Sequence, residues 1–409
     1  MENIELFKNK SECCACGACY NICPRKAISM EEDEYGFVYP KIDDSKCVKC
    51  GLCKKVCHYQ ENSNLQKPVK AYAAAGKNDD MLKKVASGGM FTLVAERILE
   101  EGGVVFGASM EYENGKLVPK HISVENREEL VKLQGSKYVQ SFIGETYAEA
   151  KKILTEGRKV LFSGTPCQIS GLKSYLGKVY ENLYTIDIIC HGVPNAKWFQ
   201  NYIKVFENKL QGNIYYYNFR DKSRGQGMNA RINYYDKNKQ SKTLYKDGHL
   251  TSFFHLFLKM NIYRENCYFC PYAKQERISD ITIGDYWGIY EEHAEEMKHS
   301  SMSNSKGISC VLVNSEKGME IFERIMPEMD YFETTVEKIA KHNMQLREPT
   351  HYTEERQKLF KIYTDSGYEG IENYFQKSIR IKKYFYSVRS MAPKGLKRKI
   401  KQMIVKVKK

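Results

Sequence analysis

The chain has 409 residues, 42% of them hydrophobic and 12% aromatic, and a formal net charge of +14. This composition is typical of a folded protein with two or three domains, and it excludes collagen-like and disordered classes. Thirteen Lys and Arg residues and no acidic residue lie in 377–409, so the rest of the chain is nearly neutral. A basic tail on a neutral body argues against nucleic acid as a partner.

No apolar run reaches the length of a membrane-spanning helix. The first ten residues, MENIELFKNK, contain no apolar signal-peptide core. We therefore expect a cytoplasmic protein, in which the fourteen cysteines are reduced and free to bind metal.

Residues 1–64 are rich in cysteine and contain an internal repeat. Each of two runs has the spacing C-x2-C-x2-C-x3-C, which is typical of bacterial ferredoxins. In that arrangement three thiolates of a run bind one [4Fe–4S] cluster and the fourth binds the other cluster. We therefore expect two crossed ligand sets, namely Cys13, Cys16, Cys19 and Cys57, and Cys47, Cys50, Cys53 and Cys23.

Zinc is the alternative reading of these runs. Structural zinc takes four ligands from two separated cysteine pairs, which explains eight cysteines in two longer runs poorly. Cys14 cannot replace Cys13, because it is one residue too near Cys16. Gly17 and Gly51 suit the loops, since glycine lets backbone N–H groups approach the sulfurs closely.

From Val69 the sequence alternates between strand and helix patterns, which predicts an α/β (α+β) body with a mixed sheet. The predicted strands are 71–76, 103–110, 159–167, 183–192, 214–221, 230–236 and 308–315. The predicted helices are 89–103, 125–135, 146–157 and 196–210.

Beyond about Thr335 the sequence is mainly helical and ends in a basic tail. After Pro393-Lys394-Gly395, apolar residues recur at helical spacing among Lys and Arg: Leu396, Ile400, Met403 and Val407. This pattern fits an amphipathic helix on an anionic surface, either lipid headgroups at the membrane or an acidic electron-carrier protein. An unstructured, solvated basic tail fits the pattern equally well.

Five stretches of the body resemble, in the same order, the coenzyme F-420 hydrogenase/dehydrogenase beta-subunit family. They are 86–108, 133–141, 160–176, 186–194 and 267–288. The resemblance implies a flavoprotein that binds FAD and a [4Fe–4S] cluster. It also implies electron exchange between ferredoxin or another low-potential donor and a substrate or partner redox subunit.

The resemblance also suggests a division into domains. Residues 1–64 would form the ferredoxin-type module, and 65–150 the FAD-binding N-terminal domain of the family. The family's C-terminal domain, 151–334, would hold a third cluster and the side that faces FAD and substrate. Residues 335–409 would form the helical segment and the basic tail.

Two loops are candidate FAD contacts. Ser87, Gly88 and Gly89 come just before a helix, whose N-terminus favours a pyrophosphate; the alternative is an ordinary helix cap. Gly164 and Thr165 follow a strand, at the sheet edge where α/β proteins bind ligands. Lys137 is a candidate cation near the flavin, with a solvated lysine as the alternative.

Four downstream cysteines are candidates for a third [4Fe–4S] cluster: Cys167, Cys190, Cys267 and Cys270. Two follow strands and two form a C-x2-C pair, so three loops would deliver four thiolates. Structural thiols or zinc are the alternatives. We expect His191 to be a hydrogen-bonding neighbour of Cys190, and Cys14 and Cys310 to be spare.

The sequence therefore predicts an iron–sulfur flavoprotein oxidoreductase that passes low-potential electrons to FAD. The alternative is a non-catalytic electron-transfer subunit of a larger complex. A zinc protein that binds nucleic acid is disfavoured, because the positive charge is confined to the tail. The loop 223–227 reads SRGQG, where family members often carry an aromatic residue, so the substrate and the use of coenzyme F-420 are not carried over.

Overall fold

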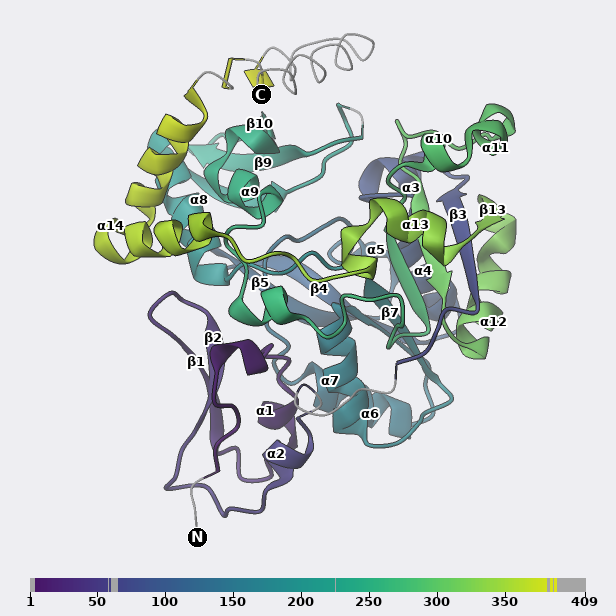
Figure 1. Ribbon diagram of the computed structural model, residues 1–409, viewed down its shortest axis with the longest axis horizontal. Helices are drawn as coiled ribbons and strands as arrows, with labels where there is room; N and C mark the ends of the chain where they lie inside the picture. Colours follow the sequence, from purple (N-terminus) through teal and green to yellow (C-terminus); the bar gives the residue numbers. More distant parts are fainter. Residues whose placement is uncertain are drawn as a thin grey trace.

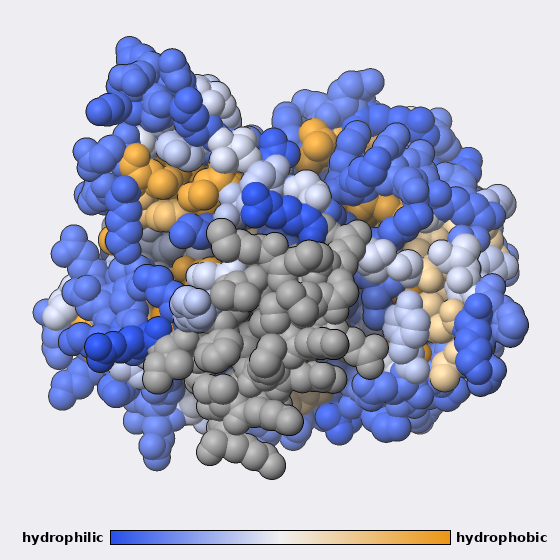
Figure 2. Space-filling view, turned by 90° about the horizontal axis from the view of Figure 1, so that it is seen from above, coloured by the Kyte–Doolittle hydropathy of each residue, from blue (hydrophilic) through white to orange (hydrophobic). Residues whose placement is uncertain are grey.

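The computed structural model describes residues 4–57, 59, 65–224, 226–380, 383–384 and 386–387. A cysteine-rich module at the N-terminus lies against one end of a larger α/β body (Figure 1). The predicted amphipathic segment of the tail lies outside the described residues. In the described part, no helix is both long and apolar enough to cross a membrane. The face seen in Figure 2 is mostly hydrophilic, with smaller hydrophobic areas.

The module consists of two cysteine loops and a hairpin. The loops lead into α1 (Ala18–Ile22) and α2 (Leu52–Lys55), and the hairpin pairs β1 (Ile28–Glu32) with β2 (Val38–Ile42) in antiparallel fashion. Gly17 and Gly51 precede the two helices with φ of 81° and 76°, a left-handed conformation that favours glycine. The two loops therefore repeat in backbone conformation as they do in sequence.

The body is built on a mixed sheet, as the sequence predicted, and this sheet has eight strands. In spatial order these are β13 (Met329–Thr334), β3 (Lys70–Gly76), β12 (Ser309–Val313), β11 (Ile281–Asp285), β7 (Leu183–Ile188), β6 (Val160–Gly164), β4 (Val104–Glu113) and β5 (Lys116–Val124). The central strands β11, β7, β6 and β4 are parallel. Their carboxyl ends therefore meet at one edge of the sheet.

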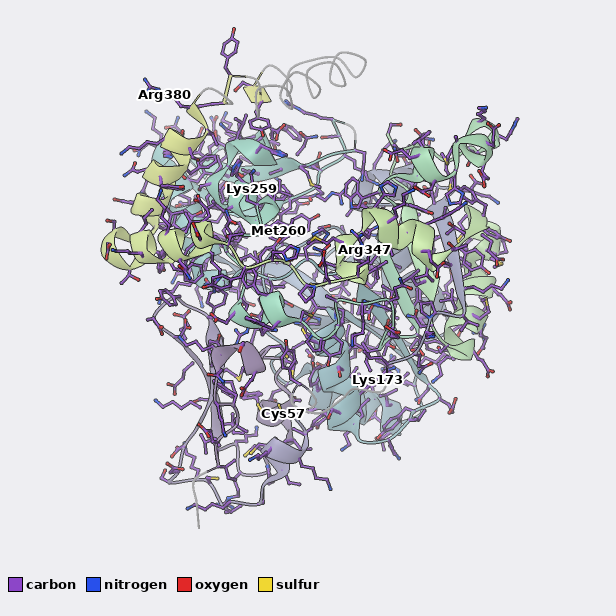
Figure 3. The ribbon with its side chains drawn as sticks, in the orientation of Figure 1. Cys57, Lys173, Lys259, Met260, Arg347 and Arg380 are labelled. Carbon is purple, nitrogen blue, oxygen red and sulfur yellow. The ribbon has the colours of Figure 1, made fainter. Side chains whose placement is uncertain are left out.

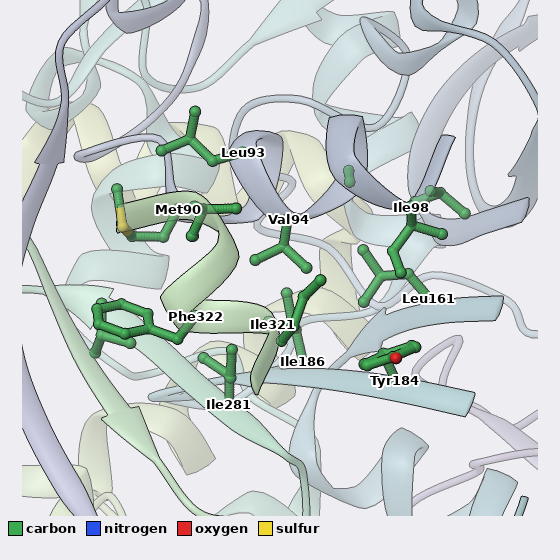
Figure 4. Packing of buried hydrophobic residues seen from close by; sticks show 14 of the residues in the cluster. Met90, Leu93, Val94, Ile98, Leu161, Tyr184, Ile186, Ile281, Ile321 and Phe322 are labelled. Carbon is green, nitrogen blue, oxygen red and sulfur yellow. The ribbon is translucent and has the colours of Figure 1, made fainter. Parts of the chain in front are cut away.

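Helices cover both faces of this sheet. On one face lie α3 (Asp79–Lys84), α4 (Met90–Glu100), α5 (Arg127–Leu130) and α12 (Glu316–Ile325). On the other lie α6 (Thr146–Thr155), α7 (Pro166–Leu176), α10 (Ile289–Glu292), α11 (Ala294–His299) and α13 (Val336–His342). Figure 4 shows Val94 and Ile98 of α4 and Ile321 of α12 packed over the strands. Successive strand residues point to opposite faces, so Val105 and Phe106 belong to different cores.

A second, three-stranded sheet lies beside the body. Its order is β10 (Ser241–Asp247), β9 (Asn229–Asp236) and β8 (Gly212–Asn218), with α8 (Ala196–Leu210), α9 (Ser252–Leu258) and α14 (Glu354–Ser378) packed on it. This core also takes in Phe37 and Tyr39 of the module, so module and body share buried contacts.

The predicted strands and helices are all present. In the body, the sequence analysis did not indicate strands β5, β10, β11 and β13 or helix α7; of these, β5, β11 and α7 border the candidate site described next. The predicted domain boundaries stay a prediction. Two buried hydrophobic clusters contain residues from both the module and the body.

Candidate redox centre

Two pockets in the module are lined by the two predicted cysteine sets. Site I, of about 400 Å³, is lined by Cys13, Cys16, Cys19 and Cys57. Site II, of about 350 Å³, is lined by Cys47, Cys50, Cys53 and Cys23. Each pocket thus receives three thiols from one run and the fourth thiol from the other run, as the crossed arrangement requires.

Thiols of the same set act on one another in both pockets. Burial raises the pKa of Cys19 well above its usual value, and nearby Cys16, Cys13 and Cys57 raise it further. In site II, burial raises the pKa of Cys53, backbone N–H groups lower it in part, and Cys23 and Cys47 add a smaller upward effect. Without metal such thiols stay protonated, whereas bound iron supplies the positive charge that lets thiolates form. The residues therefore fit iron–sulfur clusters.

Backbone N–H groups also point at sulfur atoms in site II. Lys49 N–H donates to Cys47 Sγ at 3.4 Å, and Ala27 N–H donates to Cys23 Sγ at 3.3 Å. Such donors stabilise charge on cluster sulfurs. Across the described residues, no three His, Cys, Asp or Glu side chains lie close enough to hold a single metal ion.

The four downstream cysteines converge at the carboxyl edge of the parallel strands, and we call this set site III. Cys167 lies in the first turn of α7, and Cys190 follows β7 by two residues. Cys267 and Cys270 come from the short turn Glu265–Phe269 and its C-cap. Burial, followed by Cys267, Cys167 and Cys270, raises the pKa of Cys190 well above its usual value.

Sites I and III adjoin one another through α7. The buried Cys14 thiol interacts with both Cys16 of site I and Cys167 of site III, which raises its pKa strongly. On α7, a Cβ added to Gly171 would lie 2.9 Å from Cys16 Sγ, so only glycine allows this approach. Next to α2, the Val56 carbonyl accepts a hydrogen bond from Ser174 of α7 at 2.8 Å. Cys57 follows Val56 in the chain, and Figure 3 shows it on the side of the module that faces α7. Lys173 marks α7 in that view.

A buried arginine also lies between sites I and III. The Arg264 side chain is fully buried, and its Nε donates to the Cys13 carbonyl at 3.0 Å. Its guanidinium centre is 4.0 Å from the ring centre of Tyr39. The attraction of this cation lowers the pKa of Cys13 and of Cys267, against the larger effect of burial. Within the described part of the chain, its Nη2 is buried with no hydrogen-bond partner.

The loop of Ser87, Gly88 and Gly89 lies at the same edge of the sheet as site III, just before α4. The Gly88 N–H donates to Ser309 Oγ at 2.9 Å, and an added Cβ there would lie 2.4 Å from the Ala74 carbonyl oxygen. The role of Gly88 is therefore to allow close packing against β3 and β12. Gly89 caps α4 with φ of 86° and without a side-chain hydrogen bond, which leaves the helix N-terminus to other acceptors.

The other predicted flavin contacts lie around the ends of β6 and β4. Thr165 Oγ1 is 3.2 Å from Cys167 Sγ and also caps α7. Its hydroxyl therefore contacts a cysteine of site III and the start of the helix. Gly164 lets His121 and Gln168 come close. The Lys137 ammonium donates to the carbonyls of Lys132 and Gln134, and burial lowers its pKa.

Three of the five family-like stretches meet around Arg220 and Lys222 of the stretch FRDK (219–222), which sequence reasoning did not select. Arg220 forms a buried ion pair with Asp285 at the end of β11, and Tyr138 lies close enough to interact with its guanidinium. Lys222 donates to the Ser87 carbonyl at 2.6 Å, and burial lowers its pKa to about 8. Nε and Nη2 of Arg220 are buried with no partner among the described residues, so they can donate to a ligand. The charged stretch FRDK was the feature of the sequence that could have pointed to Arg220 and Lys222.

Taken together, the fold and the three cysteine sites define an iron–sulfur redox protein with an α/β body. The model of the 4Fe-4S dicluster domain matches residues 12–60. The models of the coenzyme F420 hydrogenase/dehydrogenase beta subunit match residues 71–145 (N-term) and 157–339 (C terminus). The chain belongs to this beta-subunit family and carries an N-terminal dicluster domain, which assigns two [4Fe–4S] clusters to the module.

Among solved structures, the chain is similar to a chain of the F420-reducing [NiFe] hydrogenase complex from Methanosarcina barkeri, studied by xenon derivatization. The identity is 17%, the match covers 74% of this chain and 94% of that chain, and the TM-score is 0.40. No curated protein matches the chain.

Proposed function

We propose that the chain is an iron–sulfur flavoprotein oxidoreductase that passes low-potential electrons through three [4Fe–4S] clusters to FAD. The observation that carries this proposal is the order of the sites. Site II includes the exposed Cys50, site I adjoins the body through α7, and site III lies at the sheet edge. Such a series leads from solvent to the edge at which α/β sheets bind ligands.

The cluster ligands are the three cysteine sets named above. Burial and the neighbouring thiols raise the pKa of Cys19 in site I and of Cys190 in site III, which disfavours free thiolates there and favours thiolates around iron. We assign the flavin to the edge near site III, where Arg220 and the N-terminus of α4 can bind its polar groups. Bound FAD would supply the conversion between single electrons and electron pairs.

The partners follow from this assignment. The donor would be ferredoxin or another low-potential carrier, and the acceptor a substrate or a partner redox subunit. The basic tail remains a candidate for peripheral membrane contact. The boundaries 1–64, 65–150, 151–334 and 335–409 remain our proposed division.

The test is the metal and flavin content of protein purified without oxygen. We expect about twelve iron atoms and one FAD per chain. Replacing Cys16 or Cys57 by serine should each lower the iron content to about eight, because both belong to site I. Cys14→Ser is the matched control, since Cys14 lies beside the same sites and is not assigned as a ligand.

Other outcomes would contradict specific parts of the proposal. Full iron content in the Cys57→Ser protein would contradict the crossed assignment. About eight iron atoms in the unmodified protein would remove site III. Iron without flavin would favour a non-catalytic electron-transfer subunit, and zinc in place of iron would end the electron-transfer assignment.

A further inference from the structure

We propose that the surface around site II is a docking face for an acidic one-electron carrier protein. This inference rests on the proposed function only in that site II holds a cluster. It adds where electrons enter the molecule and what kind of surface delivers them.

Site II is open to the surface. Cys50 is exposed, and beside it Val48 is 59% and Leu52 40% exposed. Site I, by contrast, is covered by the body, because its loop contacts Arg264 and Gly171. An incoming electron carrier can therefore approach the cluster of site II most closely at this apolar spot.

Basic residues surround the spot. Segments 24–26 and 46–55 line or flank site II and contain no acidic residue. Their exposed cations are Arg25, Lys26, Lys46, Lys49, Lys54 and Lys55. Lys26 forms an ion pair with Glu145, and Lys46 forms one with Asp43. Since the chain outside 377–409 is nearly neutral, this group is a local concentration of positive charge.

Two acidic residues, Asp43 and Asp44, come just before Lys46 next to site II, whereas the acidic residues of the hairpin are used in other contacts. Glu32 pairs with Lys197 of α8 at 2.7 Å, and Asp33 pairs with Lys10 at 2.8 Å. The module is therefore positive around site II and negative where its hairpin meets the body. A partner with an acidic rim around its own redox centre would be steered to site II in one orientation.

The apolar centre and the basic rim together indicate the class of partner. Val48 and Leu52 provide the small apolar contact of a transient redox complex, and the cations provide steering. In the encounter the reduced carrier loses one electron and the cluster of site II gains it, so no bond is made or broken.

The experiment measures how fast a reduced acidic 2[4Fe–4S] ferredoxin reduces the full-length holoprotein in a stopped-flow instrument. The double variants Lys54→Glu/Lys55→Glu and Lys46→Glu/Lys49→Glu should each react about tenfold more slowly at low salt. The wild-type rate should fall as salt is added. Lys237→Glu/Lys239→Glu, exposed at the β9–β10 turn, has the same change in charge and should leave the rate unchanged.

Dithionite, which needs no docking, separates the possible failures. If dithionite reduces every variant equally and the iron content is full, a slower reaction with ferredoxin reports docking. Unchanged ferredoxin rates in both patch variants would overturn the docking face. Absence of iron, or failure of dithionite to reduce the wild type, would instead contradict the proposed function.

Discussion

Arg264 shows how a single residue links the chemistry of two sites. An arginine stays charged in proteins, and a buried charge without a counter-ion is costly. Here the guanidinium is fully buried, contacts the Tyr39 ring and donates to Cys13, yet Nη2 is left without a partner among the described residues. Thiolate-bound clusters would provide the negative charge that this cation requires.

We therefore predict that Arg264→Gln lowers the reduction potential of the cluster in site I. The cation stabilises the more negative, reduced state, and its loss should shift the one-electron equilibrium about tenfold, or about 59 mV. An EPR-monitored redox titration of the loaded protein measures this shift. Arg264→Lys should retain most of the potential, because it retains the charge.

Arg356→Gln is the matched control for this prediction. Arg356 is also buried and lies 4.0 Å from the ring centre of Phe360, but it is paired with Glu265 at 3.7 Å. If both glutamine variants shift the potential equally, the effect of Arg264 is structural and not electrostatic.

Helix α7 is the element that joins the module to the body. It starts at Pro166 with a capping box of Thr165 and Gln168, carries Cys167 in its first turn, and presents Gly171 to the loop of Cys16. Glycine inside a helix costs about 1 kcal/mol relative to alanine. Here glycine is needed because it lets the loop of Cys16 pack closely against α7, which places site I next to site III.

Replacing Gly171 by alanine should therefore destabilise the protein in spite of the better helix propensity. The added Cβ would lie 2.9 Å from Cys16 Cβ and Sγ and 3.0 Å from the Tyr147 hydroxyl. Overpacking of this kind costs about 1–3 kcal/mol, and displacement of Cys16 should lower the iron content. Denaturant unfolding and iron analysis measure both effects. Gly227→Ala, whose Cβ would meet only Asn229 at 3.5 Å, should change neither.

The sequence predicted the buried strands better than the elements that border the site. Strands such as β6 and β7 are rich in apolar residues and mostly buried, because both of their faces are covered. β5 lies at the edge of the sheet, contains Pro119 and alternates in burial, so it has no such run. Gly164 and Thr165 just before α7, followed by Pro166, resemble a turn. Pro at the first helical position and a Thr-x-x-Gln capping box are nevertheless helix-start signals.

At the scale of the whole molecule, the module and the body share two hydrophobic cores. Ala18 and Val56 pack with Ile143 and Ile169, and Phe37 packs in the core that contains Trp198. Polar contacts also cross the junction, such as Gln140 to the Cys14 carbonyl at 3.0 Å. The module is therefore part of one folded unit and not an appendage on a linker.

We predict that removal of iron destabilises the body as well as the module. Metal binding to a folded site adds to folding stability, and the shared cores transmit its loss. Anaerobic chelation should lower the temperature of a single unfolding transition and change the fluorescence of Trp198, measured in a Trp287→Phe background. Reconstitution with iron and sulfide should reverse both changes. Two separate transitions, with the body unchanged, would contradict this prediction.

The sequence by itself determined the chemistry of the module, because cluster ligation depends on local spacing. Three cysteines with two residues between each can surround one cluster only in a tight loop. The apolar runs likewise predicted the mixed α/β body. Site III illustrates the limit of local spacing, because Cys167, Cys190 and Cys267 are far apart in sequence and meet only at the edge of the folded sheet.

Only the tertiary structure decided the roles of Cys14, Gly171, Arg220 and Arg264. Each is defined by contacts with distant segments, such as Cys13 with Arg264 or Arg220 with Asp285. Burial and charge pairing depend on all the neighbours that packing brings together, and no local pattern of residues specifies them. For this reason the cluster motifs were visible in the sequence, whereas the contacts that bring the three cysteine sets together were not.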